Sequence, residues 1–302
     1  MPVRHNEDIQ NEEMSKGVRF PLGPGAWDSP HVKTELLLQA HMQRMQLPIV
    51  DYMTDTRSVM EQAIRIVTAM LDVASDCGWV KPVRACVSLL QALSQGCFWD
   101  NSPLLQLPHL RADDALFQEL TRIMGVGARF SSLLPWKSAQ DSVAAAASAA
   151  ISSAAAAMLP QHAKDLLRAF SSLPRLSVSA RWTIDAPADT SAEKRISAEV
   201  DADANRVLVV LTSMENRPSS GSGFAAHAPR FPKGREEGWW LLVCAGDVLI
   251  TSKRIGSRSS MVTRLTVPTC DADAQGLVLH VMSDCYVGLD MSLSLSSSGE
   301  AR

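Results

Sequence analysis

Three neighbouring residues near the start of the chain, His5, Glu7 and Asp8 in the stretch HNED, have side chains of the kind that bind metal ions. Residues this close in sequence rarely complete a metal site, so we favour a capping or salt-bridge role for them. The other histidines are scattered and predict no catalytic triad: His31, His41, His109, His162, His227 and His280. We therefore expect no metal site in this chain.

The motifs that carry most enzyme chemistry are absent from the sequence. There is no GxxxxGKS/T phosphate loop, no HExxH zinc motif and no GxSxG nucleophile motif. The six cysteines form no CxxC pair, which indicates reduced thiols in the nucleus or the cytoplasm. We expect no catalytic residue in this chain.

Two closely spaced glycines, Gly125 and Gly127, lie between apolar flanks in LTRIMGVGARFSSLL, residues 120–134. Exposed glycine amides in a helix-hairpin-helix turn can face a phosphate group. Short glycine motifs also match by chance, so the alternative is a plain glycine turn between packed helices. Both interpretations stay open, and we favour the second.

The composition narrows the class of protein. The chain has 302 residues, 46% hydrophobic and 20% charged, which is typical of a globular protein with two or three domains. The formal net charge of −3, from 29 basic and 32 acidic residues, disfavours a strong free-standing nucleic-acid binder. No secretory signal opens the chain, and no apolar run reaches the ~18–20 residues of a bilayer-spanning helix. We expect a nuclear or cytoplasmic protein that is neither secreted nor membrane-spanning.

Apolar residues recur at helical spacing in the first half of the chain. The expected helices are 31–47, 54–79 and a third that Pro82 opens. Residues 1–30 contain prolines and glycines that disfavour a long helix. Thr54 or Asp55 is the expected cap of the second helix, and Gly78 its expected end. Its expected apolar stripe consists of Val59, Ala63, Ile66, Val67, Met70 and Ala74, widened by Met60, Ile64 and Leu71.

Shorter helices are expected next, before the hydrophobic period changes from 3.6 to 2. Residues 105–134 and 161–174 have helical patterns, and the Ala/Ser-rich tract between them predicts a helical extension or an insertion. Patterns for about seven short strands then follow without an intervening helix, which is typical of an Ig-like β-sandwich. The expected strands are 176–185, 206–213, 239–244, 248–254, 261–267, 276–282 and 286–296.

These patterns predict a multidomain chain that is α first and all-β last. The expected units are a helical bundle at 1–104, a helix-loop-helix at 105–174 with an Ala/Ser-rich insertion at 138–157, and an Ig/fibronectin-III-like β-sandwich at 175–302. The adjacent Trp239 and Trp240 lie on one strand of the sandwich, where neighbouring side chains point to opposite faces. We expect one indole to pack between the sheets and the other to anchor the sandwich to a neighbouring domain.

Five long stretches together resemble one family of domains. They are PVRHNEDIQN (2–11), DSPHVKTELLLQAHMQRMQLP (28–48), DYMTDTRSVMEQAIRIVTAMLDVASDCGW (51–79), APRFPKGREEGWW (228–240) and MSDCYVGLD (282–290). They look like the Sec-63-type domain that closes each helicase cassette of the large Ski-2-like RNA/DNA helicases, and most like a C-terminal cassette. The resemblance implies a helical bundle, a helix-loop-helix and an Ig/fibronectin-like sandwich. Because the family bundle begins earlier, it also implies a truncated chain or a fragment with a partial bundle.

The resemblance also implies a function. In such helicases the lobes use ATP and Mg, which this chain would not bind, while the non-catalytic Sec-63-type domain lines the nucleic-acid channel with a ratchet helix. Residues 55–77 resemble that helix, and Arg65 and Thr68 on its polar stripe are the candidates to face a nucleic-acid strand. An equally open alternative is an ordinary surface pair of Arg65 with Glu61, since acidic side chains on the stripe repel phosphate.

The sandwich is expected to contact proteins. Arg230, Lys233 and Arg235 belong to a stretch, 228–265, with seven basic and three acidic residues and hence a net charge of +4. The resemblance implies helicase lobes or cointegrator-complex subunits as partners, and single-stranded nucleic acid in the intact parent, but no membrane. The alternative, which the acidic net charge of the whole chain favours, is a free-standing protein-interaction scaffold without a nucleic-acid role.

Overall fold

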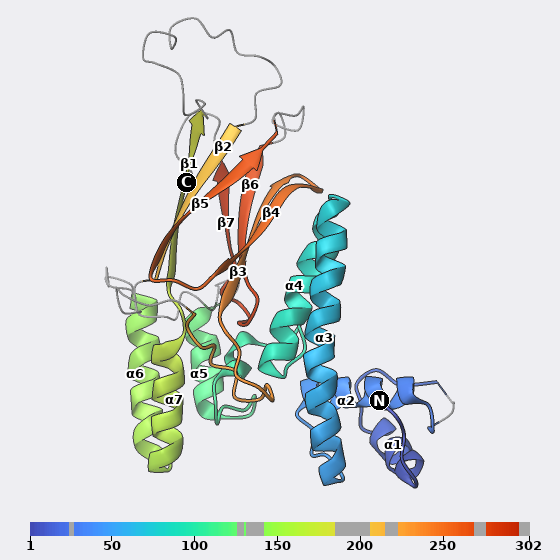
Figure 1. Ribbon diagram of the computed structural model, residues 1–302. Helices are drawn as coiled ribbons and strands as arrows, with labels where there is room; N and C mark the ends of the chain where they lie inside the picture. Colours follow the sequence, from blue (N-terminus) through green and yellow to red (C-terminus); the bar gives the residue numbers. More distant parts are fainter. Residues whose placement is uncertain are drawn as a thin grey trace, which may run out of the picture.

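The computed structural model describes residues 1–23, 27–125, 130, 142–184, 206–214, 223–268 and 276–295. Within these residues all helices precede all strands along the chain (Figure 1). The helices are α1 (Glu7–Ser15), α2 (Pro30–Gln43), α3 (Val50–Asp76), α4 (Val80–Gln95), the short 3-10 helix η1 (Pro103–Gln106), α5 (Ala115–Met124), α6 (Ser142–Ala157) and α7 (Pro160–Ser172). The predicted order of helices first and strands last is confirmed. No helix in the described part of the chain is long and apolar enough to cross a membrane.

The strands form two antiparallel sheets. They are β1 (Leu176–Ile184), β2 (Arg206–Met214), β3 (Gly238–Ala245), β4 (Val248–Gly256), β5 (Ser260–Val267), β6 (Leu277–Ser283) and β7 (Met291–Leu295). One sheet has the order β1-β2-β5 and the other the order β4-β3-β6-β7. The last strand is shorter than the expected 286–296, because Gly288 turns the chain at φ 80°. A Cβ on Gly288 would lie 2.8 Å from Pro103, so the loop between β6 and β7 packs directly against η1.

The helical half departs from the sequence expectations at two places. The short helix α1 lies in the region where only a long helix was disfavoured, and no sequence signal predicted it. Helix α3 begins four residues before Thr54, after Ile49, and no side chain caps it. The predicted capping role of Thr54 or Asp55 is therefore wrong. Gly78, at φ 72°, follows the end of α3 as predicted.

The Ala/Ser-rich tract is helical over the residues that the structure describes. Every third or fourth residue of α6 is buried, namely Ala144, Ala147, Ile151 and Ala155, and the helix packs between α5 and α7. Small side chains allow neighbouring helices to approach closely, which explains how so weakly hydrophobic a segment forms a packed helix. Residues 138–141 lie outside the described part of the chain.

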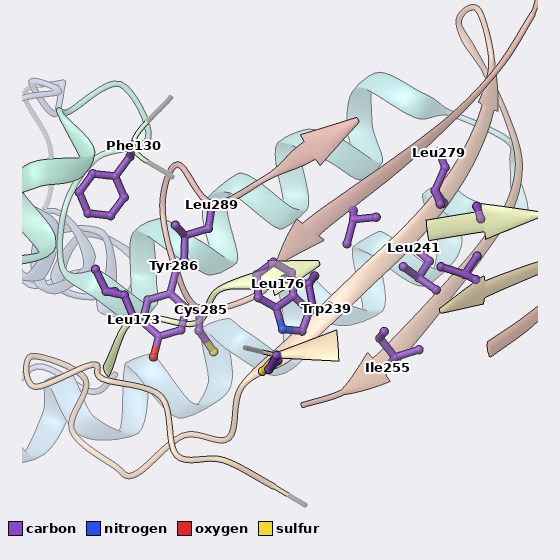
Figure 2. Close-up of a cluster of buried hydrophobic side chains, with 14 of the residues drawn as sticks. Phe130, Leu173, Leu176, Trp239, Leu241, Ile255, Leu279, Cys285, Tyr286 and Leu289 are labelled. Atoms are coloured by element: carbon purple, nitrogen blue, oxygen red, sulfur yellow. The ribbon is translucent and has the colours of Figure 1, made fainter. Parts of the chain in front are cut away.

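Two apolar cores meet at the larger sheet. The sandwich core lies between the two sheets and continues into α5, α6 and α7; it includes Leu120, Ile151, Leu166, Leu208, Trp239, Leu241, Leu265 and Leu279. Figure 2 shows part of this core, from Phe130 near the helices to Leu241 and Leu279 in the sheets. The bundle core joins α2, α3 and α4 to the opposite face of β3; it includes Leu37, Val59, Leu71, Val87, Leu90, Trp240, Leu242 and Cys244. Strand β3 thus contributes to both cores.

Candidate functional site

The surface of α3 carries an arginine that has no partner within the described residues. Arg65 is exposed, and the ion pair with Glu61 that the sequence suggested is not formed. Instead, the Oε1 atom of Glu61 lies 3.6 Å from Nε of Arg57 and 4.0 Å from Nζ of Lys233. The guanidinium of Arg65 is therefore available for a group from outside the chain.

The second candidate on α3, Thr68, is half-buried. Its hydroxyl donates a hydrogen bond of 2.8 Å to the backbone oxygen of Ile64, one helical turn earlier. The hydroxyl can still accept a hydrogen bond, but its proton is engaged. Since a phosphate oxygen only accepts, Thr68 suits contact with the N–H group of a base better than contact with a phosphate.

An apolar stripe is exposed along the C-terminal half of α3. Ile66, Met70 and Val73 have exposed fractions of 59%, 54% and 61%. Ile66 and Met70 of the expected apolar stripe are thus exposed, whereas Val67 and the widening residue Leu71 are buried. The reason is that only one side of this half of α3 is covered: Val67 and Leu71 lie in the core that α3 shares with α4, and the residues beside them face outward.

The glycine turn is described only in part. Gly125 ends α5 with φ 67°, and a Cβ at that position would meet nothing within 4 Å. Glycine is favoured at this position because of its positive φ angle and not because space is lacking, as is common just after the end of a helix. Gly127 lies outside the described residues, so the predicted phosphate-facing turn stays a prediction.

The adjacent tryptophans belong to different cores. Trp239 is 1% exposed in the sandwich core, and Figure 2 shows its indole among the labelled apolar side chains. Trp240 is 6% exposed and lies in the bundle core with Val83 and Val87 of α4. Neither indole N–H has a hydrogen-bond partner among the described residues. Both side chains thus contribute by packing rather than by polar contacts.

The three basic residues expected at a partner contact have separate surroundings. Arg235 is mostly buried, and its guanidinium contacts the backbone oxygen of Asp284 at 3.3 Å and the sulfur of Cys285 at 3.2 Å. Lys233 is exposed and its only close acidic neighbour in the described structure is Glu61. Arg230 is exposed and packs along Gly96, where a Cβ would lie 3.2 Å from its Cδ atom. These residues therefore do not form one continuous basic surface.

A buried charge cluster joins α1, α2 and α3. Lys33 of α2 is fully buried, and its Nζ atom lies 2.6 Å from Oε2 of Glu7 and 2.7 Å from Oδ2 of Asp55. Arg4 pairs with the same two carboxylates, at 2.9 Å and 2.6 Å. The Lys33 ammonium also lies 4.8 Å above the ring of Tyr52. The favoured salt-bridge role of Glu7 is borne out, but the sequence did not indicate that Lys33 and Asp55 are its neighbours.

The acid stability of the protein is expected to depend on this cluster. Hydrogen bonds from Arg4 hold the pKa of Asp55 at about 2, against the opposing effect of burial and below its ordinary value of 3.8. A depressed carboxyl pKa stabilises the fold above pH 4, and this contribution is lost as the pH falls from about 4 to about 2. The loss is expected to be about 2–3 kcal/mol. Urea denaturation between pH 5 and pH 2 measures it.

The matched variant for this experiment is Asp55→Asn, which has no carboxyl group to protonate. Its free energy of unfolding, although lower at pH 7, is expected to fall less steeply between pH 4 and pH 2 than that of the unchanged protein. Parallel curves for the two proteins would show that Asp55 does not carry the acid sensitivity.

A second buried cluster surrounds Asp284 in the loop between β6 and β7. Its Oδ2 atom accepts hydrogen bonds from Arg254 at 2.6 Å and 3.0 Å, and its Oδ1 atom accepts one from the backbone N–H of Gly238 at 2.9 Å. The next residue, Cys285, is buried, which raises the pKa of its thiol to about 12. This loop is a structural junction, and its thiol stays protonated and unreactive at neutral pH.

Three glutamines attach the helices to the same loop. The side-chain amides of Gln91, Gln95 and Gln106 donate to the backbone oxygens of residues 283, 285 and 287 at 2.7, 2.7 and 2.9 Å. The three acceptors are alternate residues at the end of β6 and in the bend that follows it, and three donors along α4 and η1 bind them in turn. No sequence signal identified these glutamines, although their partners lie in the motif MSDCYVGLD.

The described residues offer little redox or metal chemistry. The cysteines among them, Cys77, Cys86, Cys97, Cys244 and Cys285, are free thiols. Burial also raises the pKa of Cys244, to about 11. No three metal-ligating side chains come together in the described part of the chain. The main features of the described residues are the exposed face of α3 and the buried contacts between the helices and the sheets.

The helical half is joined to the two-sheet sandwich by buried hydrogen bonds. These features define a module that is built for contacts between units. Its family is shown by comparison with known proteins: the Sec63 Brl domain matches residues 1–296, and the chain belongs to this family. The Sec63 Brl domain is a non-catalytic module of ATP-dependent helicases.

Three helicases illustrate the similarity. The chain is 34% identical over 324 residues to activating signal cointegrator 1 complex subunit 3 of Homo sapiens, and 33% over 301 residues to DExH-box ATP-dependent RNA helicase DExH14 of Arabidopsis thaliana. It is 30% identical over 301 residues to the U5 small nuclear ribonucleoprotein 200 kDa helicase of Homo sapiens. Each alignment covers 98% of this chain but only 12–14% of the relative.

Proposed function

We propose that this chain acts as an accessory module of a larger RNA or DNA helicase, lining its nucleic-acid channel and making interunit contacts. The family membership and the three helicase relatives support this proposal. ATP and Mg would then be bound by helicase lobes outside these residues. The lobes, or subunits of a cointegrator complex, are the proposed protein partners, in the nucleus or the cytoplasm.

We propose that α3 is the helix that faces the nucleic-acid strand. The observation that carries this role is the exposed guanidinium of Arg65, which has no ion pair among the described residues, whereas Arg57 on the same helix is paired with Glu61. Arginine binds phosphate groups and stacks on bases. The exposed Ile66 and Met70 beside it offer apolar contact to the faces of bases.

Replacing Arg65 with alanine in the intact parent helicase is expected to reduce strand unwinding about ten-fold, because one hydrogen bond to a charged group contributes about 1.5 kcal/mol. ATP hydrolysis is expected to change little, since the substitution lies outside the helicase lobes. Unwinding of a labelled duplex and phosphate release, measured on the same preparation, test both statements.

The matched control is Arg57→Ala, which removes an exposed arginine from the same helix. Its Nε atom is 3.6 Å from Glu61, so a surface ion pair rather than a strand contact is lost. Unwinding by Arg57→Ala is expected to remain close to that of the unchanged helicase. Equal unwinding by Arg65→Ala and the unchanged helicase would remove the role proposed for α3.

We also propose that the units of this chain are a bundle at 1–104, a helix-loop-helix unit at 105–174 and an Ig/fibronectin-III-like sandwich at 175–302. Two antiparallel sheets of three and four strands, with the strand orders given above, support the sandwich assignment. Burial of Trp240 beside α4 supports its role as an anchor between sandwich and bundle.

A second candidate function is a protein-interaction scaffold without a nucleic-acid role. The exposed stripe of Ile66, Met70 and Val73 favours it, since contiguous exposed apolar side chains often mark protein contacts. The net charge of −3 points the same way. The Arg65 experiment separates the two, because a scaffold surface has no reason to affect unwinding while leaving ATP hydrolysis intact.

A further inference from the structure

A cavity of about 790 Å³, with a lining that is both polar and apolar, lies where the helical half meets the loop before β3. Its walls come from the end of α4, from η1 and the turn after it, from α7, and from residues 225–230. Cavities of about 300–1,000 Å³ hold small ligands in other proteins. The volume is thus sufficient for a ligand of the size of a nucleotide.

Two polar atoms in the wall of this cavity have no hydrogen-bond partner within the described residues. The first is Oε1 of Gln106, whose residue is 5% exposed and whose amide nitrogen already donates to the backbone oxygen of Val287. The second is Nε2 of His227, another buried atom. Buried polar atoms almost always have a partner, so these two indicate a ligand that supplies one. The Gln106 oxygen specifically requires a donor, such as a hydroxyl group.

The cavity is also positively charged. Arg168 on α7 and Arg230 in the loop before β3 both line it, and neither forms an ion pair with a described residue. The single acid in the wall, Asp165, is already engaged by His109 at 3.2 Å and by Gln161 at 3.1 Å. Burial of His227, reinforced by the charge of Arg168, lowers its pKa, so its ring is neutral at pH 7. Guanidinium groups preferentially bind phosphate oxygens through paired hydrogen bonds.

We propose that this cavity binds a phosphate ester that carries a neighbouring hydroxyl group. Arg168 and Arg230 bind the phosphate oxygens, Gln106 accepts the hydrogen bond of the hydroxyl, and Nε2 of His227 contacts a remaining polar atom of the ligand. Such a ligand is either a free ribonucleotide or one unit of an RNA strand, whose 2′-hydroxyl adjoins the 3′-phosphate. This site is separate from the strand-facing surface of α3 and does not depend on the role proposed for it.

Isothermal titration of the 302-residue chain tests the proposal, with cytidine 3′-monophosphate and its 2′-deoxy analogue as the first pair of probes. They differ by one hydroxyl group beside the phosphate. A ten-residue single-stranded RNA and the DNA of the same sequence form the second pair. Binding to the ribonucleotide is expected to be at least five-fold tighter than to the deoxy analogue. Comparable affinity per site for nucleotide and RNA identifies a free ribonucleotide as a sufficient ligand; at least ten-fold tighter binding of RNA identifies a strand.

Three variants complete the experiment. Arg168→Gln and Arg230→Gln are each expected to weaken binding at least ten-fold, whereas Lys164→Gln, an exposed position on the same helix as Arg168 that does not line the cavity, is expected to leave it unchanged. A thermal melt of each variant verifies the fold. No binding by any probe overturns the proposal. So does equal binding of the ribo and deoxy probes, or an equal loss in Lys164→Gln.

Discussion

Replacing Lys33 with methionine is expected to lower the free energy of unfolding by about 3–5 kcal/mol, because it leaves two buried carboxylates with only the partly exposed Arg4 as a cationic partner. The Lys33 side chain is fully buried within 2.7 Å of both Glu7 and Asp55. Methionine has a similar length, so the loss reports the missing charge rather than a cavity. Urea denaturation at pH 7, followed by far-ultraviolet circular dichroism, measures the change.

Two comparisons isolate the electrostatic cause. Lys16→Met removes an exposed lysine that pairs with Glu13, and its unfolding midpoint is expected to stay where it was. Adding Glu7→Gln and Asp55→Asn to Lys33→Met removes the uncompensated charges, and part of the lost stability is expected to return. If Lys33→Met and Lys16→Met unfold at the same urea concentration, the buried cluster does not hold the three helices together.

Replacing Trp240 with alanine is expected to cost about 3–5 kcal/mol and to loosen α4 more than the sheets. The indole fills the bundle core between β3 and α4, so its removal leaves a cavity on the face of β3 that meets the helices. Hydrogen exchange measured by mass spectrometry is expected to show faster exchange in residues 80–95 than in the smaller sheet.

The adjacent Trp239→Ala is the matched variant, since it removes the same side chain from the same strand on the opposite face. Its loss of stability is expected to be similar, but with faster exchange concentrated in β1, β2 and β5. Identical exchange maps for the two variants would contradict the assignment of the two indoles to separate cores.

The elements of this fold were largely predictable because their periodicity is local. The alternation in residues 176–184 depends only on a strand having two faces, and the expected strands 176–185 and 206–213 each end within one residue of the observed ones. The β6–β7 loop was expected to be strand, but Gly288 bends the chain against Pro103 of η1, a residue far away in the sequence. Which part of the apolar stripe of α3 is covered also depends on distant residues, so the local pattern did not show that Ile66 and Met70 are exposed.

The sites were less predictable than the elements, because their residues are of types that usually lie on surfaces. Lysine is almost never fully buried, so nothing at position 33 itself indicates that its side chain has no exposed surface. The orientation of Trp239 and Trp240 could be predicted, because neighbouring side chains of a strand always point to opposite faces of the sheet. Membership of each indole in a particular core depends on which helices pack on β3, and that information is distributed over the first hundred residues.

The glutamine contacts have a consequence for the order of events during synthesis. Gln91, Gln95 and Gln106 donate to carbonyl groups that follow them by 192, 190 and 181 residues. At typical translation rates of about 5–20 residues per second, the helices leave the ribosome about 10–40 s before their hydrogen-bond acceptors exist. Throughout that interval the face of α4 that will meet β3 and β6 has no sheet to cover it. The emergence of β6 and of the loop after it is therefore the step that completes these contacts of the helical half.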